Sequence, residues 1–293
     1  MGSISVVRSD SNLPCTTLDS KGTAWRDWVL NNLQRGCKPQ TMLQSMAANA
    51  WDIESAGLAL DEALALLARP HDWRTARPYI NTPTNYLDCG DRIAQVLFSL
   101  QHPRIVLIDN LLSHQECDTL IELAEQKGIK KSAVVDRESG QFVDHHARSS
   151  SGSYFTRGEN EHVACIEKRL AGITDWPVTH AEGLQILKYE PGQEYRPHFD
   201  WFDPNQPGSA KQLLRGGQRL GTFVLYLTDV EAGGSTVFPT LGVEVFPRKG
   251  AGVFFADVDE TGKTEQKSLH GGSPVIKGTK IVATYWQREN KYG

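Results

Sequence analysis

A histidine and an aspartate two positions apart, within a segment typical of a β-strand, most constrain what this chain can fold into. Successive side chains alternate across a strand, so His198 and Asp200 in residues 194–202 project from the same face. A third candidate ligand, His270, lies in a separate strand-like segment. Two histidines and one carboxylate form the ligand set that leaves open positions on non-haem Fe(II). The sequence therefore predicts an iron site carried on β-strands.

A lysine begins another strand-like segment shortly after the second histidine. Lys280 starts an alternation that places Val282, Thr284 and Trp286 on its own face. A fixed cation that faces an iron site suits an anionic co-substrate. Each residue alone is weak support, because a chain with nine histidines contains His-x-Asp pairs by chance. Their joint order and spacing are what favour a functional site.

Several stretches around these residues share their order with one enzyme family. They are residues 187–195 before the first ligands, then 216–219, 226–231, 233–239, and finally 268–286. Through these stretches, residues 104–290 resemble the 2-oxoglutarate- and Fe(II)-dependent dioxygenase superfamily, and specifically the catalytic domain of prolyl 4-hydroxylases. The resemblance implies a mainly β fold with supporting helices, a double-stranded β-helix or jelly-roll barrel.

Carried over residue by residue, the resemblance implies an Fe(II) site that also binds 2-oxoglutarate. The iron ligands are then His198, Asp200 and His270, and Lys280 is the partner of the distal carboxylate of 2-oxoglutarate. The implied reaction is hydroxylation of a prolyl residue in a peptide or protein. Succinate and CO2 are released, and ascorbate helps to restore ferrous iron. The oxygen chemistry belongs mostly to the metal and needs no nucleophile from the protein.

The resemblance also implies roles for residues beyond the iron ligands. It places Tyr189, Thr236 and Trp286 in the lining of the 2-oxoglutarate pocket. It places Arg219 and Arg148 near a peptide substrate. The alternatives are that Tyr189 and Trp286 are core aromatics and that both arginines are surface charges.

Two other functions fit the same residues. The iron and 2-oxoglutarate residues do not contact the third substrate, so the runner-up is hydroxylation of a different residue, a free amino acid or a small metabolite. A binding protein built on a degenerate barrel is the second alternative. The intact ligand set and Lys280 argue against it.

Composition bounds the class of protein and its partners. The 293 residues, 39% hydrophobic and 23% charged, are typical of a soluble enzyme with a small attachment. A net charge of -4 and the lack of basic runs longer than a pair predict no nucleic-acid partner. The five cysteines show no Cys-x-x-Cys spacing, which argues against structural zinc and a disulfide framework. Without a signal peptide or a membrane-length apolar run, we expect a cytoplasmic protein, unlike the animal collagen-modifying relatives, which work in the secretory pathway.

The chain divides into four expected regions. Residues 1–21 form a polar, disordered tail, 22–69 a small three-helix module, 70–90 a proline-containing linker, and 91–293 the dioxygenase domain. The helical module resembles ubiquitin-associated-type bundles. It is either a helical brace on the catalytic domain, which we favour, or a module that binds a partner.

Within the last region the sequence predicts several elements. Residues 91–100 and 104–109 are strand-like, Ser113 and Glu116 form a capping box that begins a helix, and residues 160–172 form a second helix. Residues 203–215 are expected to be a surface loop at the site mouth. The pair His145 and His146 is a poor chelate, because adjacent strand residues face opposite sides.

Overall fold

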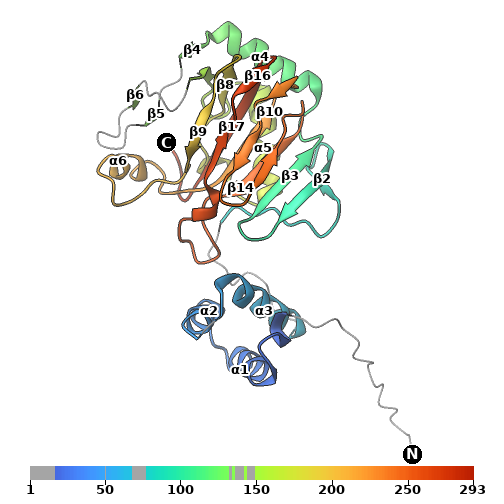
Figure 1. The fold of residues 1–293 in the computed structure, drawn as a ribbon, viewed down its shortest axis with the longest axis vertical. Coiled ribbons are helices and arrows are strands. Elements are labelled where there is room, and N and C mark those ends of the chain that lie inside the picture. The colour runs from blue at the N-terminus through green and yellow to red at the C-terminus, as the bar shows by residue number, and fades with distance from the viewer. Residues whose placement is uncertain (1–16, 50, 68–76, 132–133, 136–141, 144–148) are drawn as a thin grey trace, which may run out of the picture. The chain divides into compact units, whose positions relative to one another are not determined.

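The computed structural model describes residues 17–49, 51–67, 77–131, 134–135, 142–143 and 149–293. The chain divides into two compact units at the boundary between Ala76 and Arg77 (Figure 1). Arg148, His145 and His146 lie outside the described residues, so the predictions for them are not addressed by the fold. None of the described helices is long and apolar enough to cross a membrane.

The first unit contains the three helices that its amphipathic segments predict. They are α1 (Thr23–Gln34), α2 (Pro39–Ala47) and α3 (Ile53–Leu66). Helix α3 begins at Ile53, where the Asp52 side chain accepts a hydrogen bond from the Ser55 amide at 2.8 Å and caps the helix. The helices enclose a core that includes Val29, Leu43 and Leu60.

The last residues of the expected polar tail have a defined structure. Thr17–Asp19 forms a 3-10 turn (η1), and Leu18 is fully buried in the core of the helical unit. The amides of Thr17 and Leu18 donate to the Glu62 carboxylate at 3.1 and 2.7 Å. One apolar anchor in a polar segment therefore orders residues that composition assigns to a tail.

The second unit is built on two antiparallel sheets. The larger sheet has nine strands, in the order β1-β2-β3-β14-β10-β17-β8-β7-β4. Their bounds are Tyr86–Asp88 (β1), Ile93–Leu100 (β2), Ile105–Asp109 (β3), Gly252–Ala256 (β14), Arg219–Tyr226 (β10), Lys280–Arg288 (β17), Gln185–Tyr189 (β8), Ser151–Tyr154 (β7) and Lys130–Lys131 (β4).

The smaller sheet has four strands and carries both candidate histidine ligands. Its order is β13 (Val243–Val245), β12 (Thr236–Phe238), β15 (His270–Gly272) and β9 (Tyr195–His198). Two further ribbons pair β11 (Ala232–Gly233) with β16 (Val275–Lys277), and β5 (Val134–Val135) with β6 (Phe142–Val143). The short 3-10 turns η2 and η3 span Val178–His180 and Gln266–Ser268.

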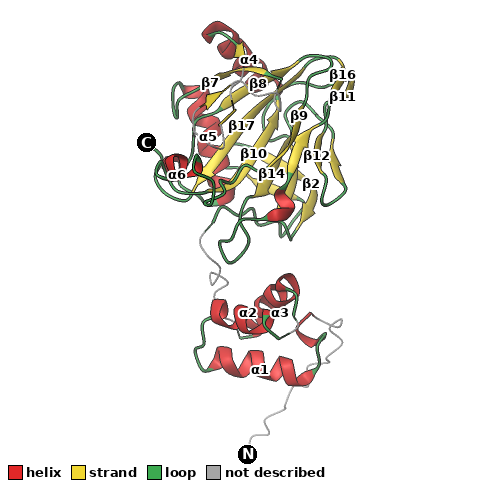
Figure 2. Ribbon diagram, turned by 60° about the vertical axis from the view of Figure 1, so that its left-hand side comes forward, coloured by secondary structure: helices red, strands yellow, loops and turns green. Residues whose placement is uncertain are grey.

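Each face of the nine-stranded sheet packs against a different partner. On one face, residues such as Ile186, Phe223 and Ala283 form a core with helices α4 (His114–Lys127) and α5 (Glu161–Thr174). Alternate residues, such as Leu187 and Val224, form a second core with the smaller sheet. Figure 2 shows α5 on one side of β10 and β17, with β9 and β12 on the other. The predicted mainly β, jelly-roll-type fold with supporting helices is confirmed.

Local signals predict the longer elements well and the shorter ones poorly. Both hydrogen bonds of the Ser113–Glu116 capping box are present at the start of α4, and the Asn160 side chain caps α5. Strand β1 lies inside the expected linker, because three residues are too few to show alternation. The expected loop at residues 203–215 contains the single-turn helix α6, Ser209–Leu213.

Candidate metal and co-substrate site

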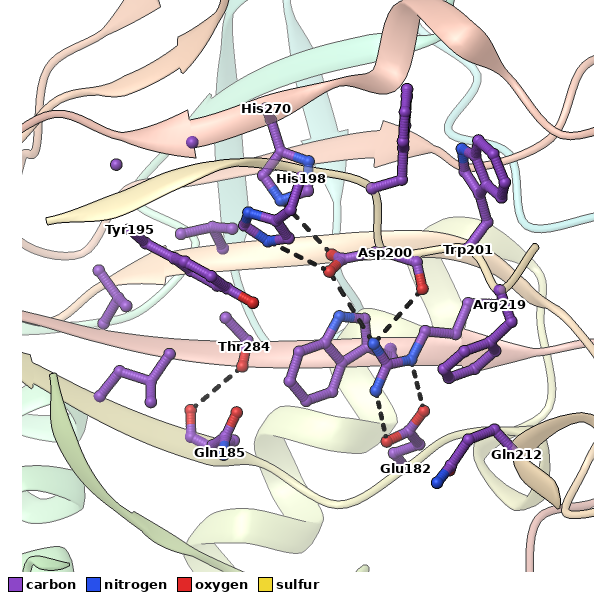
Figure 3. A pocket seen from close by; sticks show the side chains of 18 of the residues that line it. Glu182, Gln185, Tyr195, His198, Asp200, Trp201, Gln212, Arg219, His270 and Thr284 are labelled. Carbon is purple, nitrogen blue, oxygen red and sulfur yellow. Dashed lines mark hydrogen bonds and ion pairs between the residues drawn. The ribbon is translucent and has the colours of Figure 1, made fainter. Parts of the chain in front are cut away.

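The three candidate metal ligands meet where two strands of the smaller sheet pair. His198 ends β9 and His270 begins β15, and the two residues are direct partners in the antiparallel register. Asp200 follows two residues after His198. Its Oδ1 lies 3.6 Å from His198 Nε2 and its Oδ2 lies 3.6 Å from His270 Nε2 (Figure 3). All three ligand atoms fall within 4.8 Å of one another, so one ion can reach them all.

Backbone carbonyls orient both imidazoles. Nδ1 of His198 lies 2.9 Å from the Arg196 carbonyl oxygen, and Nδ1 of His270 lies 3.0 Å from the Ser268 carbonyl oxygen. A carbonyl only accepts, so each Nδ1 carries the proton and donates. Nε2 of both rings is then left with its lone pair, which is the form that binds a metal.

Burial and charge prepare these groups to act as ligands. Burial, reinforced by the neighbouring His198, lowers the pKa of His270 to about 4, so its ring is neutral at pH 7. Burial alone would raise the pKa of Asp200, but His270, His198 and Arg219 hold it well below its ordinary value. Two imidazoles and one carboxylate are the donors that non-haem Fe(II) takes in its facial arrangement.

A second group of potential ligands is occupied by an arginine. Asp91, Glu116 and Cys165 also lie close enough together to hold an ion. The Arg169 guanidinium lies among them, with Nη2 2.5 Å from Asp91 Oδ2 and 2.6 Å from Glu116 Oε1. This cluster is an ion-pair network between α4, α5 and the turn before β2.

A buried lysine stands beside the three ligands. Lys280 begins β17, pairs in register with Tyr189 of β8, and is only 5% exposed. Burial lowers the pKa of Lys280 to about 8, and among the described residues no carboxylate forms an ion pair with it. Gly272 leaves space there, because a Cβ on this residue would lie 3.4 Å from Lys280 Nζ. A buried cation with open space beside it suits an anionic ligand.

The ligands and Lys280 line one pocket of about 700 Å³. It lies between the two sheets and continues toward a rim that includes Tyr154, Gln212, Arg215 and Tyr292. Thr236 lines the lysine end, where its Oγ1 accepts a hydrogen bond from the Tyr226 hydroxyl at 2.8 Å. The pocket therefore joins a metal-binding set, an anion-binding end and an open mouth.

Comparison with known proteins decides the family. The model of the 2OG-Fe(II) oxygenase superfamily matches residues 184–288, which contain the ligands and Lys280. Probable prolyl 4-hydroxylase 3 of Arabidopsis thaliana is 39% identical over 222 residues, which are 69% of this chain and 75% of the relative. Prolyl 4-hydroxylase 5 of the same plant is 38% identical over 216 residues, which are 67% and 72% of the two chains.

The chain belongs to the prolyl 4-hydroxylase family. Among solved structures, the viral collagen prolyl hydroxylase of Paramecium bursaria Chlorella virus-1 in its 2OG complex is 34% identical. That similarity covers 63% of this chain and 95% of the viral chain, with a TM-score of 0.49.

In this prolyl 4-hydroxylase family member, not all of the residues expected around the co-substrate lie together. Tyr189 and Thr236 lie near Lys280, the first as its cross-strand partner and the second on β12 beside Gly272. Trp286 is on the same face of β17, but it is six residues along the strand, roughly 20 Å away. The Arg219 guanidinium lies over the Trp286 ring, 4.0 Å from its centre. Trp286 is thus placed at the opposite end of the pocket.

Arg219, expected near the substrate, lines the pocket but is already engaged by a buried acid. Its Nε and Nη2 donate to the two oxygens of Glu182 at 2.7 and 3.0 Å (Figure 3). Its Nη1 reaches toward Asp200, 3.4 Å from the carbonyl oxygen. Glu182 also accepts from Arg288 at 2.9 Å, and Arg288 donates to backbone carbonyls that flank the end of α6. Glu182 therefore links the wall of the site to its mouth.

Several residues of the site are missed by the sequence reasoning. They are Glu182, Thr222, Tyr226, Asp257 and Arg288. The alternation in β10 places Thr222 and Tyr226 on one face with Val224, which is a signal that could have found them. Asp257 follows a wholly apolar strand and shows no local pattern. Burial, and then the negative charge of Asp200, raise the pKa of Asp257 well above its ordinary value.

Proposed function

We propose that this chain is an Fe(II)- and 2-oxoglutarate-dependent dioxygenase that hydroxylates a prolyl residue in a peptide or protein. The observation that carries the proposal is the joint placement of His198, Asp200 and His270 beside the buried cation Lys280 in one pocket. Family membership supports the same reaction, because relatives that match most of their own length are named prolyl 4-hydroxylases.

The residues present fit both the metal and the co-substrate. Iron would be held by the two Nε2 atoms and the Asp200 carboxylate, and 2-oxoglutarate would place its distal carboxylate against Lys280. When bound, iron would supply the chemistry by which O2 and 2-oxoglutarate give succinate, CO2 and a hydroxylated carbon. The protein's own contribution is to orient the metal ligands and to supply the anchoring charge. Lys280 would anchor the distal carboxylate, and Tyr189 and Thr236 line the anion-binding end.

A peptide is the substrate that we propose, rather than a free amino acid or small metabolite. The pocket continues past the ligands to a rim with two tyrosines, Tyr154 and Tyr292, and its volume of about 700 Å³ exceeds what 2-oxoglutarate and one proline ring require. Arg219 lies between the ligands and this rim. A short peptide segment fits that course better than a single amino acid does.

Three further parts of the function are proposals of the same kind. Ascorbate is the proposed reductant that restores ferrous iron, and the cytoplasm is the proposed compartment, in keeping with five cysteines that lack a disulfide framework. We propose that the N-terminal helices either brace the catalytic domain or bind a partner, and that they take no part in catalysis. In support, every residue that lines the described pocket comes from the second unit.

The deciding experiment measures succinate formed from 2-oxoglutarate when O2 is added to protein loaded anaerobically with Fe(II). The assay is run with a proline-rich peptide, with the same peptide carrying alanine in place of proline, and without peptide. Succinate stimulated only by the proline peptide, with the mass of one oxygen added to proline, is the expected result. Succinate formation that the peptide does not stimulate would support dioxygenase activity but would exclude that peptide as the substrate. Iron binding without turnover would favour a binding protein.

A further inference from the structure

Two buried carboxylates share one threonine hydroxyl behind the metal ligands. Thr222 Oγ1 lies 2.9 Å from Oδ2 of Asp200 and 2.8 Å from Oδ2 of Asp257. Thr222 and Asp257 are fully buried, and Asp200 is 7% exposed. Neither Thr222 nor Asp257 lines the pocket, so neither one is placed to touch a ligand in it.

The sheet register explains why these side chains meet. Thr222 on β10 pairs with Phe255 on β14, and Asp257 comes two residues after Phe255. Residues two apart on a strand share a face, so Asp257 projects to the same side as Thr222. The Asp257 amide continues the ladder by donating to the Leu220 carbonyl at 2.9 Å. Backbone pairing, rather than a flexible loop, therefore sets the position of Asp257.

Counting hydrogens decides how the three groups are bonded. A threonine hydroxyl has a single hydrogen, so it can donate to only one of the two carboxyl groups. The other contact needs a hydrogen from a carboxyl group. Asp200 lies beside two imidazoles and Arg219, a setting that holds its negative charge. Asp257 then carries the hydrogen, donates to Thr222, and Thr222 donates to Asp200.

The surroundings of Oδ1, the second carboxyl oxygen of Asp257, agree with a neutral Asp257 that donates to Thr222. Among the described residues, Oδ1 of Asp257 has no hydrogen-bond partner although it is buried. A negative charge on a buried group with one bare oxygen would be costly, whereas a neutral carboxyl group leaves only an unpaired carbonyl oxygen. Two guanidinium nitrogens of Arg219 donate to Glu182 and the third is directed at Asp200, so none of them is bonded to Asp257.

We propose that Asp257 is a positioning residue that holds the metal ligand Asp200 through the Thr222 hydroxyl. The proposal rests on the proposed function, since it takes Asp200 to be an iron ligand. The chain of two hydrogen bonds restrains rotation of the Asp200 carboxylate and ties it to β10 of the larger sheet. Groups that orient a metal ligand in this way typically affect metal affinity by about 10- to 100-fold.

The test measures Fe(II) binding directly, by anaerobic calorimetric titration with the metal alone. Asp257→Leu keeps the shape of the side chain but cannot donate, and Thr222→Val removes the hydroxyl at nearly constant volume. Both variants should bind Fe(II) about 10- to 100-fold more weakly than the unmodified protein. Asp257→Asn keeps a donor toward Thr222, so it should bind Fe(II) nearly as well as the unmodified protein.

The double variant tests whether Asp257 acts through Thr222. If it does, Asp257→Leu combined with Thr222→Val should be no weaker than either single variant, because each already breaks the same chain. Three results would each overturn the proposal. They are additive losses of Fe(II) affinity in the double variant, unchanged Fe(II) affinity in Asp257→Leu, and an Asp257→Asn protein that binds Fe(II) as weakly as Asp257→Leu does. Should Asp257→Leu fail to fold, an unaffected Thr222→Val protein or a weakly binding Asp257→Asn protein would still overturn the proposal.

A spectroscopic measurement separates positioning from a general loss of structure. The charge-transfer band of the Fe(II) complex with 2-oxoglutarate should move in Thr222→Val and keep its position in Asp257→Asn. An unmoved band in Thr222→Val would contradict the proposal. Failure of the unmodified protein to bind Fe(II) would instead contradict the proposed function, so the two failures are distinguishable.

Discussion

Lys280 and Tyr189 face each other across β17 and β8, and the lysine ammonium lies 5.6 Å from the centre of the tyrosine ring. Burial lowers the pKa of Lys280 to about 8. Below that pH the ammonium is already charged when 2-oxoglutarate arrives, and above it the lysine must first take up a proton. The dissociation constant for 2-oxoglutarate should therefore be independent of pH below about pH 8, where Lys280 is charged. Above about pH 8 it should rise about tenfold per pH unit.

Lys280→Arg is the matched control for this pH dependence. A guanidinium stays charged up to about pH 12, so the variant should lose the rise in dissociation constant whatever its absolute affinity. Calorimetric titration of 2-oxoglutarate across the interval measures both proteins. An unmodified protein whose affinity is constant up to about pH 9.5 would contradict a lowered pKa of Lys280.

Removing a candidate ligand should abolish turnover. His198→Ala and Asp200→Ala each delete one member of the set that lies within 4.8 Å, so we expect loss of succinate formation and weakened Fe(II) binding. His162→Ala is the control, because the His162 side chain is 48% exposed on α5 and lies outside the pocket lining. Full succinate production by either ligand variant would remove that residue from the metal site.

Glu182→Gln should cost both stability and substrate binding. Glu182 is buried between Arg219 and Arg288, and removing one partner of a buried ion pair typically costs about 3–5 kcal/mol. We expect this loss in urea unfolding, together with a raised KM for peptide. The control is Glu190→Gln, whose 47% exposed side chain pairs with Lys188 and should cost no more than about 1 kcal/mol. Equal losses in the two variants would contradict the linking role of Glu182.

Filling the space beside Lys280 should weaken 2-oxoglutarate binding. In Gly272→Val the new side chain meets Lys280 Nζ, and overpacking of this kind costs about 1–3 kcal/mol, or roughly 5- to 150-fold in dissociation constant. Gly172→Ala is the control, because a Cβ there has no atom within 4 Å. Unchanged co-substrate affinity in Gly272→Val would place 2-oxoglutarate elsewhere in the pocket.

Deleting residues 1–69 should spare the 2-oxoglutarate turnover that occurs without peptide. The pocket-lining residues all belong to the second unit, so the described site is complete without the helices. Succinate formation and a thermal melt of the truncated protein measure this. A truncated protein that melts cooperatively but forms no succinate would place the helical unit in the active site.

Strand alternation explains how much of the site the sequence could predict. It correctly gives a shared face for Lys280 and Trp286, and their spacing of six residues, roughly 20 Å along a strand, puts the two residues at opposite ends of the pocket. Glu182 and Asp257 reach the site through pairing between segments far apart in the chain. No local pattern records such pairing. The carbonyls that orient the histidines lie only two residues away in the chain, but their direction is set by the folded backbone.

Metal binding would also join the two layers of the barrel. The histidines belong to the smaller sheet, whereas Asp200 is tied to the larger sheet through Thr222. A metal ion bound by all three residues would therefore cross-link the two sheets, and the sheets could separate only after the metal ion is released. Occupancy of the site is then coupled to the resistance of the whole domain to unfolding, with each tenfold excess of free metal over its dissociation constant adding about 1.4 kcal/mol. Iron supply would then affect the stability of the folded domain as well as its rate of turnover.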